Sequence, residues 1–463
     1  MNKKVLMITY VFPPAAWVGG LRTLKYCKYL GRDGWTPIVI AARPIGVTFQ
    51  DESLLHQIPS SVLVHRTFDV DPAKWEEKLA ARKLRRSKAA AAAPVDEHSL
   101  AYAQRTTVAP GLFRRAKQLV KSILKDSPDS HIFWVPFAFF RGVAILRKEG
   151  VDVIYCTSPP HSSHFAAYLL AKLFRKPYVL DFRDPWYVSG SVRSPDNKIP
   201  ALLKLETRAK RTVVRGAARV ICASRGERDE LRVEFPDVEA NRFVSITNGY
   251  DPSDFEVAKP ASRGSNRLIL THAGTIYSGA AGELFAALQR LAKERPELTG
   301  RLQVQLLGEI AHEYAETIRE LESKGLVRAL GMRPHAVALQ ALMESDVLIV
   351  LLGGSMFLPS EIPTKVYEYL HAGKPILAIA AEGEATHILR QSGLGIVVPP
   401  MEVEKLIEEL GNLVADHAAG RLRRVPNQSY IRTFERAALA EQLAHVLDTV
   451  RESELARPQC SSR

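Results

Sequence analysis

The segment 360–375 combines residue types that can bind a phosphorylated ligand. Pro363 lies near the start of a predicted short helix, and Gly373 follows its end. Lys365 and Glu368 are three residues apart, so their side chains share one face of that helix. A helix N-terminus and a lysine can together neutralise a diphosphate, and a carboxylate one turn further on can hold a ribose diol. A solvated ion pair between the two side chains is the alternative interpretation.

A pair of glycines offers a second position for an anion. The first apolar run, 5–9, leads into a Phe-Pro-Pro turn, after which Gly19 and Gly20 open a predicted helix. Glycines let the backbone approach a ligand closely, with the amides of the helix terminus pointing at an anion. An ordinary glycine turn is the alternative, and the spacing is not the G-x-G-x-x-G fingerprint of dinucleotide-binding proteins.

Polar residues also follow two further predicted strands. His161 and His164 come after one of them, and Asp181 and Arg183 lie at the end of the next. Because ligands of open α/β sheets bind at the carboxyl ends of strands, His161, Asp181 and Arg183 are candidates for catalysis or hydroxyl recognition. His161 is preferred to His164 because it lies nearer its strand. A fixed ion pair between Asp181 and Arg183 is an alternative interpretation.

Short β-branched runs alternate with helical stretches along the chain. Seven strand candidates precede a polar break at 258–266, and six follow it. Several runs are apolar on both faces, as strands covered by helices on both sides must be. The pattern predicts an α/β protein with two Rossmann-like, doubly wound domains, 1–257 and 267–430, that face a cleft and close about the linker. A C-terminal helix, 431–455, could cross back to the first domain, and we expect a disordered tail at 456–463.

The positive charge of the chain is concentrated in a predicted insertion at 74–125. The net charge is +13, and this stretch has 13 Lys and Arg against four Asp and Glu, so it contributes 13 − 4 = +9. Such a patch suits nucleic acid or an anionic membrane surface. Nucleic acid is disfavoured because no binding motif or interleaved aromatic residue accompanies the basic residues. Apolar residues recur at helical spacing within 111–125, which predicts contact with a membrane surface; a helix packed on the core is the alternative.

Composition points to a cytoplasmic enzyme. Hydrophobic residues make up 46% and charged residues 24% of the chain, as in ordinary globular enzymes. No apolar run approaches the roughly 18 residues that a membrane-spanning helix needs. The four cysteines follow no metal or redox pattern, which fits a reducing compartment.

In their order and spacing, these motifs resemble glycosyltransferase family 4, which has the GT-B fold. The resemblance extends over nearly the whole chain and is carried by 9–22, 159–164, 181–186, 248–251, 272–277 and 363–375. It implies transfer of a sugar from a nucleotide-sugar donor with retention of configuration, without a bound metal or other cofactor. The acceptor would be a glycan or a lipid-linked intermediate of cell-surface polysaccharide synthesis.

The resemblance also implies roles for individual residues. Glu368 would match the second glutamate of the family's E-x7-E motif and bind the donor ribose. Lys365 and the amides near Gly274 and Thr364 would stabilise charge on the leaving diphosphate. The donor-binding set would comprise Gly19, Gly20, Gly274, Thr364, Lys365 and Glu368, and the catalytic set Lys365, His161, Asp181 and Arg183.

The sequence departs from the family pattern at two places. Ser360 stands where the first glutamate of E-x7-E is expected, because Glu361 is one residue out of register, and 277–281 contains no basic residue where the family usually has one. A non-catalytic nucleotide-sugar-binding scaffold and a nucleotide-sugar epimerase of the same fold therefore remain alternatives. Asp69 and Asp71 form a D-x-D triplet, a spacing that chelates metal in other sugar transferases, but it adjoins the basic insertion, and metal binding there is disfavoured.

Overall fold

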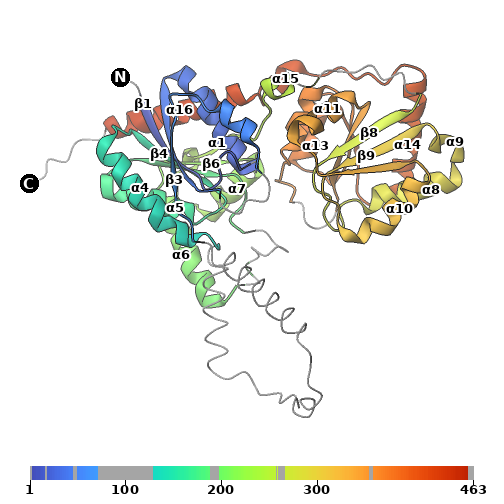
Figure 1. The fold of residues 1–463 in the computed structure, drawn as a ribbon. Coiled ribbons are helices and arrows are strands. Elements are labelled where there is room, and N and C mark those ends of the chain that lie inside the picture. Colours follow the sequence, from blue (N-terminus) through green and yellow to red (C-terminus); the bar gives the residue numbers. More distant parts are fainter. Residues whose placement is uncertain are drawn as a thin grey trace, which may run out of the picture. The chain divides into compact units, whose positions relative to one another are not determined.

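The chain forms two compact α/β units and contains two sheets (Figure 1). The computed structural model describes residues 3–15, 18–44, 50–70, 129–187, 195, 198–256, 258, 266–353 and 358–456. The first unit comprises Met1–Cys27, Gly34–Val220 and Leu447–Arg463, and the second comprises Lys28–Asp33 and Ile221–Val446. The predicted fold class, with two Rossmann-like, doubly wound domains, is confirmed.

The first sheet has seven strands in the order β3-β2-β1-β4-β5-β6-β7. Chain order reverses beside β1, which pairs in parallel with β2 on one side and β4 on the other. Ligands of doubly wound proteins bind at such a switch point. The strands are β1 (Lys3–Ile8), β2 (Trp35–Ala42), β3 (Leu63–Thr67), β4 (Val153–Ser158), β5 (Tyr178–Phe182), β6 (Arg219–Cys222) and β7 (Phe243–Ser245).

Helices bury the central strands of the first sheet, so that all residues of β4 and β5 are buried. This explains why both strands are apolar on both faces, as the sequence pattern indicated. The helices of this part of the chain are α1 (Val18–Tyr29), α4 (Val135–Lys148), α5 (Ser163–Phe174), α6 (Pro200–Gly216) and α7 (Arg225–Glu234).

The second sheet has six parallel strands in the order β10-β9-β8-β11-β12-β13. Its strands are β8 (Leu268–Ala273), β9 (Leu302–Leu307), β10 (Val327–Gly331), β11 (Val347–Leu352), β12 (Ile376–Ala380) and β13 (Gly395–Val398). The helices that accompany them are α8 (Gly282–Glu294), α9 (Pro296–Thr299), α10 (Ala315–Ser323), α11 (His335–Glu344), α12 (Lys365–Ala372), α13 (Glu384–Gln391) and α14 (Val403–Ala418).

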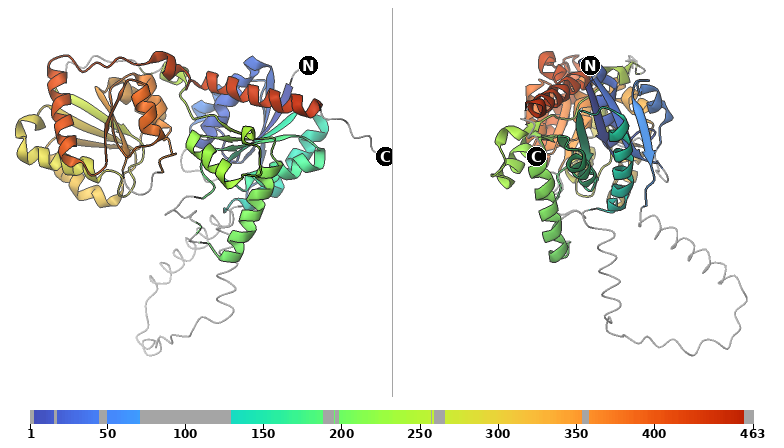
Figure 2. Two further views of the ribbon diagram at one scale, coloured as in Figure 1. Left: turned by 180° about the vertical axis from the view of Figure 1, so that it is seen from behind. Right: turned by 90° about the vertical axis from the view of Figure 1, so that its left-hand side faces the viewer.

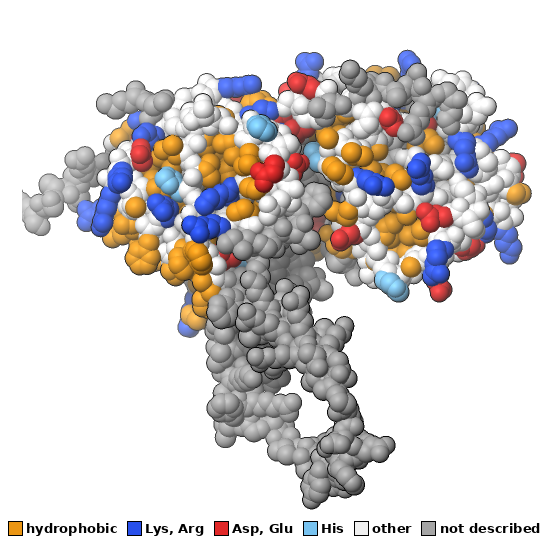
Figure 3. All heavy atoms as spheres, viewed as in Figure 1, with side chains coloured by type: hydrophobic (Ala, Val, Ile, Leu, Met, Phe, Trp, Pro, Cys, Tyr) orange, Lys and Arg blue, Asp and Glu red, His pale blue; other side chains and the backbone are white. Residues whose placement is uncertain are grey.

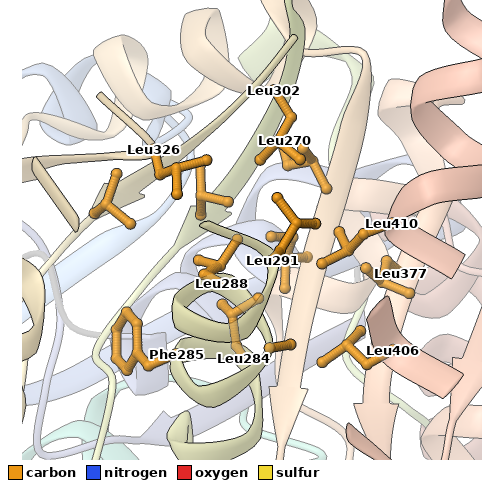
Figure 4. Close-up of a cluster of buried hydrophobic side chains, with 14 of the residues drawn as sticks. Leu270, Leu284, Phe285, Leu288, Leu291, Leu302, Leu326, Leu377, Leu406 and Leu410 are labelled. Atoms are coloured by element: carbon orange, nitrogen blue, oxygen red, sulfur yellow. The ribbon is translucent and has the colours of Figure 1, made fainter. Parts of the chain in front are cut away.

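A leucine-rich cluster holds α8 and α14 against the second sheet (Figure 4). Leu284, Leu288 and Leu291 recur at helical spacing on α8 and are fully buried. They share the cluster with Leu270 of β8 and Leu410 of α14. Each buried leucine stabilises the unit by roughly 1.5–3 kcal/mol relative to exposure, so this face fixes where α8 begins at the edge of the sheet.

The predicted helix after Pro363 is confirmed as α12. It ends where Gly373 adopts a left-handed conformation with φ 67°. Val366, Tyr367 and Leu370 are buried, and this anchors one side of the helix in the core of the second unit. Because the helix is anchored in this way, the positions of Lys365 and Glu368 are fixed.

The chain ends in α15 (Gln428–Arg432) and α16 (Arg436–Leu455). The last turns of α16 belong to the first unit and lie along it in the views of Figure 2. There, Asp448 accepts hydrogen bonds from Lys3 Nζ at 2.6 Å and from Trp35 Nε1 at 3.1 Å, and Arg451 pairs with Asp152 at 3.0 Å. These bonds attach the C-terminal helix to β1, to the start of β2 and to the residue before β4.

Several predictions concern residues outside the described part of the chain. These are the basic insertion at 74–125 with its segment 111–125, the tail from 457 onwards, Asp71 of the D-x-D triplet, residue 257, and most of the linker, 259–265. Among the residues that are described, no helix has the length and apolarity needed to cross a membrane.

Candidate functional site

Glycines end four neighbouring strands of the second sheet. Gly274 follows β8, Gly308 follows β9, Gly331 closes β10 and Gly353 follows β11. A Cβ atom on Gly308 would lie 2.4 Å from the carbonyl oxygen of Gly274, and φ there is +130°, so no side chain fits this position. The carboxyl edge of the sheet is thus lined by backbone, which lets a ligand approach closely.

The ammonium of Lys365 lies at this edge, beside Gly274. A Cβ atom on Gly274 would lie 2.7 Å from Lys365 Nζ, so the lysine occupies the space that a side chain would need. Nζ lies 3.2 Å from Nε2 of His272, a residue of β8 that is 1% exposed. The other ring nitrogen, Nδ1, lies 3.0 Å from the carbonyl oxygen of Ile349 and therefore carries the proton. His272 Nε2 then accepts the hydrogen bond that Lys365 donates.

Burial controls the charge state of both side chains. It lowers the pKa of Lys365 to about 8, against the opposing effect of the Glu368 carboxylate. Burial also lowers the pKa of His272 well below its usual value, and the neighbouring lysine lowers it further. His272 is therefore a neutral acceptor, and Lys365 carries the positive charge of the pair below about pH 8.

Glu368 lies one turn along α12 from Lys365. Its Oε1 is 3.0 Å from Nε2 of His335, the first residue of α11, and its side chain keeps 23% of its surface exposed. The partner of Glu368 is thus His335, while that of Lys365 is His272. Thr364 is the N-cap residue of α12, so its backbone adjoins the same edge.

Two parts of the second unit correspond to the departures from the family pattern. Ser360 is 7% exposed, and its Oγ has no hydrogen-bond partner among the described residues. Two residues of the loop before α8 donate hydrogen bonds to the carboxylate of Glu313: Gly279 through its backbone N–H at 2.8 Å, and Ser278 through its hydroxyl. Glu283 in the first turn of α8 has a buried Oε2 that finds no partner within the described chain. Carboxylates, rather than a basic side chain, therefore occupy this loop and helix start.

Asp181 forms a buried ion pair in the first unit. Both side chains are fully buried, with Arg22 Nε 2.8 Å from Oδ2 and Nη2 3.0 Å from Oδ1, and the Tyr155 hydroxyl also donates to Oδ2. The alternative interpretation had paired Asp181 with Arg183, but the partner is Arg22. Removal of one member of such a pair typically costs about 3–5 kcal/mol, so this pair fixes α1 against β5.

Arg183 lies against the start of α1. A Cβ atom on Gly19 would lie 3.3 Å from Arg183 Nε, an atom that is buried and has no hydrogen-bond partner in the described chain. The guanidinium also donates to Asp184 Oδ2 at 3.0 Å. Gly20, the second glycine, packs against Val11, where a Cβ atom would lie 3.1 Å from Cγ1.

His161 is held beside the same loop. It is 3% exposed, its Nε2 lies 3.2 Å from the carbonyl oxygen of Asp184, and its ring centroid is 4.9 Å from that of Trp186. His164 is fully buried, and burial lowers its pKa to about 3, against the opposing effect of Asp181. His164 is therefore a neutral core residue.

The predicted site residues thus fall into two groups. Those in the second unit are Gly274, Thr364, Lys365 and Glu368, and those in the first unit are Gly19, Gly20, His161, Asp181 and Arg183. In the first unit, Arg183 contacts Gly19 and adjoins Asp184, whose carbonyl oxygen bonds to His161. Asp181 instead forms an ion pair with Arg22. Sequence reasoning missed four residues with a part in these groups. They are Arg22, His272, Glu283 and His335.

Asp69 of the D-x-D triplet accepts a hydrogen bond from the Tyr10 hydroxyl. The described residues contain no group of three or more His, Cys, Asp or Glu side chains that could hold a metal ion.

Part of the chain is similar to a known protein family. Residues 126–249 match the model of the "Glycosyl transferase 4-like domain". The chain carries a glycosyl transferase 4-like domain. Over these residues the predicted resemblance to glycosyltransferase family 4 is confirmed. Curated protein sequences yield no match.

Solved structures share the fold at low sequence identity. Alr3699/HepE of Anabaena, solved in complex with UDP and glucose, is 16% identical over 96% of this chain and 100% of its own, with a TM-score of 0.53. The lipopolysaccharide outer core galactosyltransferase WaaB is 13% identical over 96% and 99%, with a TM-score of 0.53. The α,α-trehalose 6-phosphate synthase of Burkholderia multivorans is 12% identical over 100% of both chains, with a TM-score of 0.59.

The charge state of Lys365 can be measured directly. We expect competitive acylation, followed by mass spectrometry, to show half-maximal reactivity of Lys365 near pH 8, because burial lowers its pKa. In the Glu368→Gln variant, the pKa of Lys365 should be lower, because the carboxylate charge that favours the ammonium is removed. The exposed Lys405 on α14 is the internal reference. A Lys365 profile that coincides with that of Lys405 would show the burial argument to be wrong.

Proposed function

We propose that the protein transfers a sugar from a nucleotide-sugar donor to a glycan or lipid-linked acceptor in cell-surface polysaccharide synthesis, with retention of configuration. The observation that carries this proposal is the Lys365 ammonium at the backbone edge of the second sheet, with Glu368 one turn away. The complex of HepE with UDP and glucose supports it, because that protein has the same fold. The proposed location is the cytoplasm.

In this proposal the donor diphosphate binds at Gly274 and the start of α12. Negative charge builds on the diphosphate as its bond to the sugar loosens, and Lys365 and the amides of the helix terminus stabilise that charge. An approaching anion raises the pKa of a neighbouring lysine, so the diphosphate itself would keep Lys365 protonated. Glu368 accepts hydrogen bonds from the ribose hydroxyls, as its partly exposed carboxylate allows.

The acceptor side is proposed to involve the first unit. Gly19 and Arg183 together present a helix start and a guanidinium, groups that suit a phosphate or a sugar hydroxyl. His161 would position the loop that carries Arg183, since it bonds to the backbone of Asp184. A retaining reaction on one face of the sugar needs no separate general base, and the proposal names none.

The donor assignment predicts a loss of affinity in Glu368→Ala. Removing a charge-assisted hydrogen bond should weaken donor binding by about 1.5–3 kcal/mol, or about 10- to 150-fold. A panel of nucleotide-sugars screened by thermal shift identifies the donor, and calorimetry then compares the variants. Glu408→Ala, which changes an exposed carboxylate on α14, is the matched control. Unchanged donor affinity in a folded Glu368→Ala protein would rule out this role.

Transfer assays separate the proposed enzyme from its alternatives. The unpartnered Ser360 hydroxyl and the carboxylates at the start of α8 favour a protein that binds a nucleotide-sugar without transferring the sugar. Donor binding with no turnover, across a range of acceptors, would support that scaffold. Consumption of the nucleotide-sugar in the absence of any acceptor would instead indicate an epimerase.

We further propose that transfer needs no bound metal. The support is the sequence, in which the carboxylates of the predicted cleft segments do not cluster. Activity should persist after exhaustive chelation, when the charge of Lys365 and the helix amides would still stabilise the leaving group. A loss of activity that Mn²⁺ or Mg²⁺ restores would make Asp69 and Asp71 candidate ligands.

We propose a peripheral position on the inner face of the membrane, through the basic segment 111–125. Each basic residue near an anionic surface contributes roughly 1 kcal/mol, and salt screens the attraction. The protein should therefore float with anionic vesicles at low salt and dissociate from them at high salt. Replacement of Arg114, Arg115, Lys117, Lys121 and Lys125 by Gln should reduce this binding. Equal partitioning to neutral and anionic vesicles would contradict the proposal.

A further inference from the structure

The solvent-exposed face of α4 combines aromatic and basic side chains. Phe137, Phe140, Arg141, Arg147 and Lys148 are all exposed and lie on one stripe of the helix, because their spacings follow its turns. Phe140 is 70% exposed, a large apolar area for a soluble surface.

The aromatic part of this stripe continues onto the first sheet. Phe68, directly after β3, is 53% exposed, and its ring centroid lies 6.2 Å from that of Phe137. The guanidinium of Arg43 lies over the Phe68 ring at 5.4 Å. We call Phe68, Phe137, Phe140, Arg141, Arg147 and Lys148 the α4 surface.

The opposite side of α4 fixes the helix to the first unit. Ala138, Gly142 and Ile145 are buried, and α4 packs on β2, β3 and α5. Gly142 allows a close approach to α5, since a Cβ atom there would lie 2.4 Å from a methyl group of Leu170. The exposed stripe is therefore presented from a rigid element, and its apolar side chains have no place in the core.

The α4 surface is positively charged. The helix contains no acidic residue, and the carboxylate that follows it, Glu149, is paired with Lys4 at 2.6 Å. Figure 3 shows hydrophobic and basic side chains together over the part of the first unit where Figure 1 places α4. Exposed phenylalanines beside unbalanced arginines and lysines match the boundary between acyl chains and anionic headgroups.

We infer that the α4 surface lies against an anionic lipid bilayer. Phe137 and Phe140 enter the headgroup boundary, while Arg141, Arg147 and Lys148 bind lipid phosphates. The inference rests on the proposed function in that a lipid-linked acceptor would be met at such a surface. It stands on side chains of described residues, separately from the segment 111–125.

Vesicle flotation of the full-length protein tests the inference. The vesicles contain phosphatidylcholine with or without phosphatidylglycerol. Loss of the aromatic rings in the Phe137→Ser, Phe140→Ser variant should lower partitioning to anionic vesicles by about tenfold or more. Phe140→Ser alone, at the more exposed position, should act in the same direction without disturbing the fold. Val233→Ser, which changes a side chain on α7 that is 82% exposed, is the matched control and should float as the wild type does.

A second variant tests the charged part of the surface. Replacement of Arg141, Arg147 and Lys148 by Gln should reduce the preference for anionic vesicles at low salt and have little effect at high salt, where the Debye length falls to about 3 Å. Flotation of both variants at the wild-type level would overturn the inference. A variant that floats as the wild type does but sediments as a smaller species would also overturn the inference, because it would show that a second copy of the chain covers the surface. Donor affinity should be unchanged in all these variants, so a failure of the proposed function is recognised separately, by the absence of donor binding in the wild type.

Discussion

The buried ammonium of Lys365 at the carboxyl end of β8 constrains the residues around it. A cation removed from water destabilises the fold unless polar groups compensate for the lost hydration. Gly274 has a φ of +126°, which residues with a side chain rarely adopt, and a Cβ atom there would lie 2.7 Å from Nζ and displace it. His272 has to be neutral, because a protonated ring would place a second cation 3.2 Å from the first. Glu368 supplies the negative charge that favours the ammonium. The environment of one buried charge thus involves three other residues.

Each unit contains a buried cation, and the two cations differ in their partners. Arg22 in the first unit is fully buried and bonded to both carboxylate oxygens of Asp181, so its charge is balanced inside the fold. Lys365 donates to an uncharged ring, and the nearby carboxylate of Glu368 is bonded to His335. A pair that is satisfied internally serves to hold elements together, whereas a desolvated cation with an incomplete set of partners is available to an anionic ligand. This difference separates the structural charge of Arg22 from the candidate functional charge of Lys365.

Local signals in the sequence predicted most of the fold and part of the site. Pro363 and Gly373 mark the limits of α12 because their backbone preferences act within one turn. The apolar runs predicted two groups of strands, and these form the sheets of seven and six strands. The glycines that end β9, β10 and β11 were also visible after each apolar run, and this signal could have located the backbone edge.

The partners of the buried charges could not be read from the sequence. Arg22 and Asp181 are 159 residues apart, and His272 and Lys365 are 93 residues apart, so their contacts depend on strand order and on where each helix packs. Pairing Asp181 with its neighbour Arg183 was reasonable by proximity alone. It was wrong because Asp181 is buried within β5, while Arg183 follows the strand and reaches the start of α1. Tertiary packing, rather than distance along the chain, decided which charges meet.

The absence of a basic residue before α8, where the family usually has one, changes the charge at the edge of the second sheet. Glu283 lies in the first turn of α8, and Glu313 holds the preceding loop, so two carboxylates offset the positive end of that helix dipole. Under the proposed function, neutralisation of a diphosphate therefore depends mainly on Lys365 and the start of α12. Because the pKa of Lys365 lies near 8, an anion that binds there stabilises the protonated form of the side chain. Donor binding and protonation of Lys365 are then coupled, and the Glu368 carboxylate supports both by favouring the ammonium and by accepting the ribose hydroxyls.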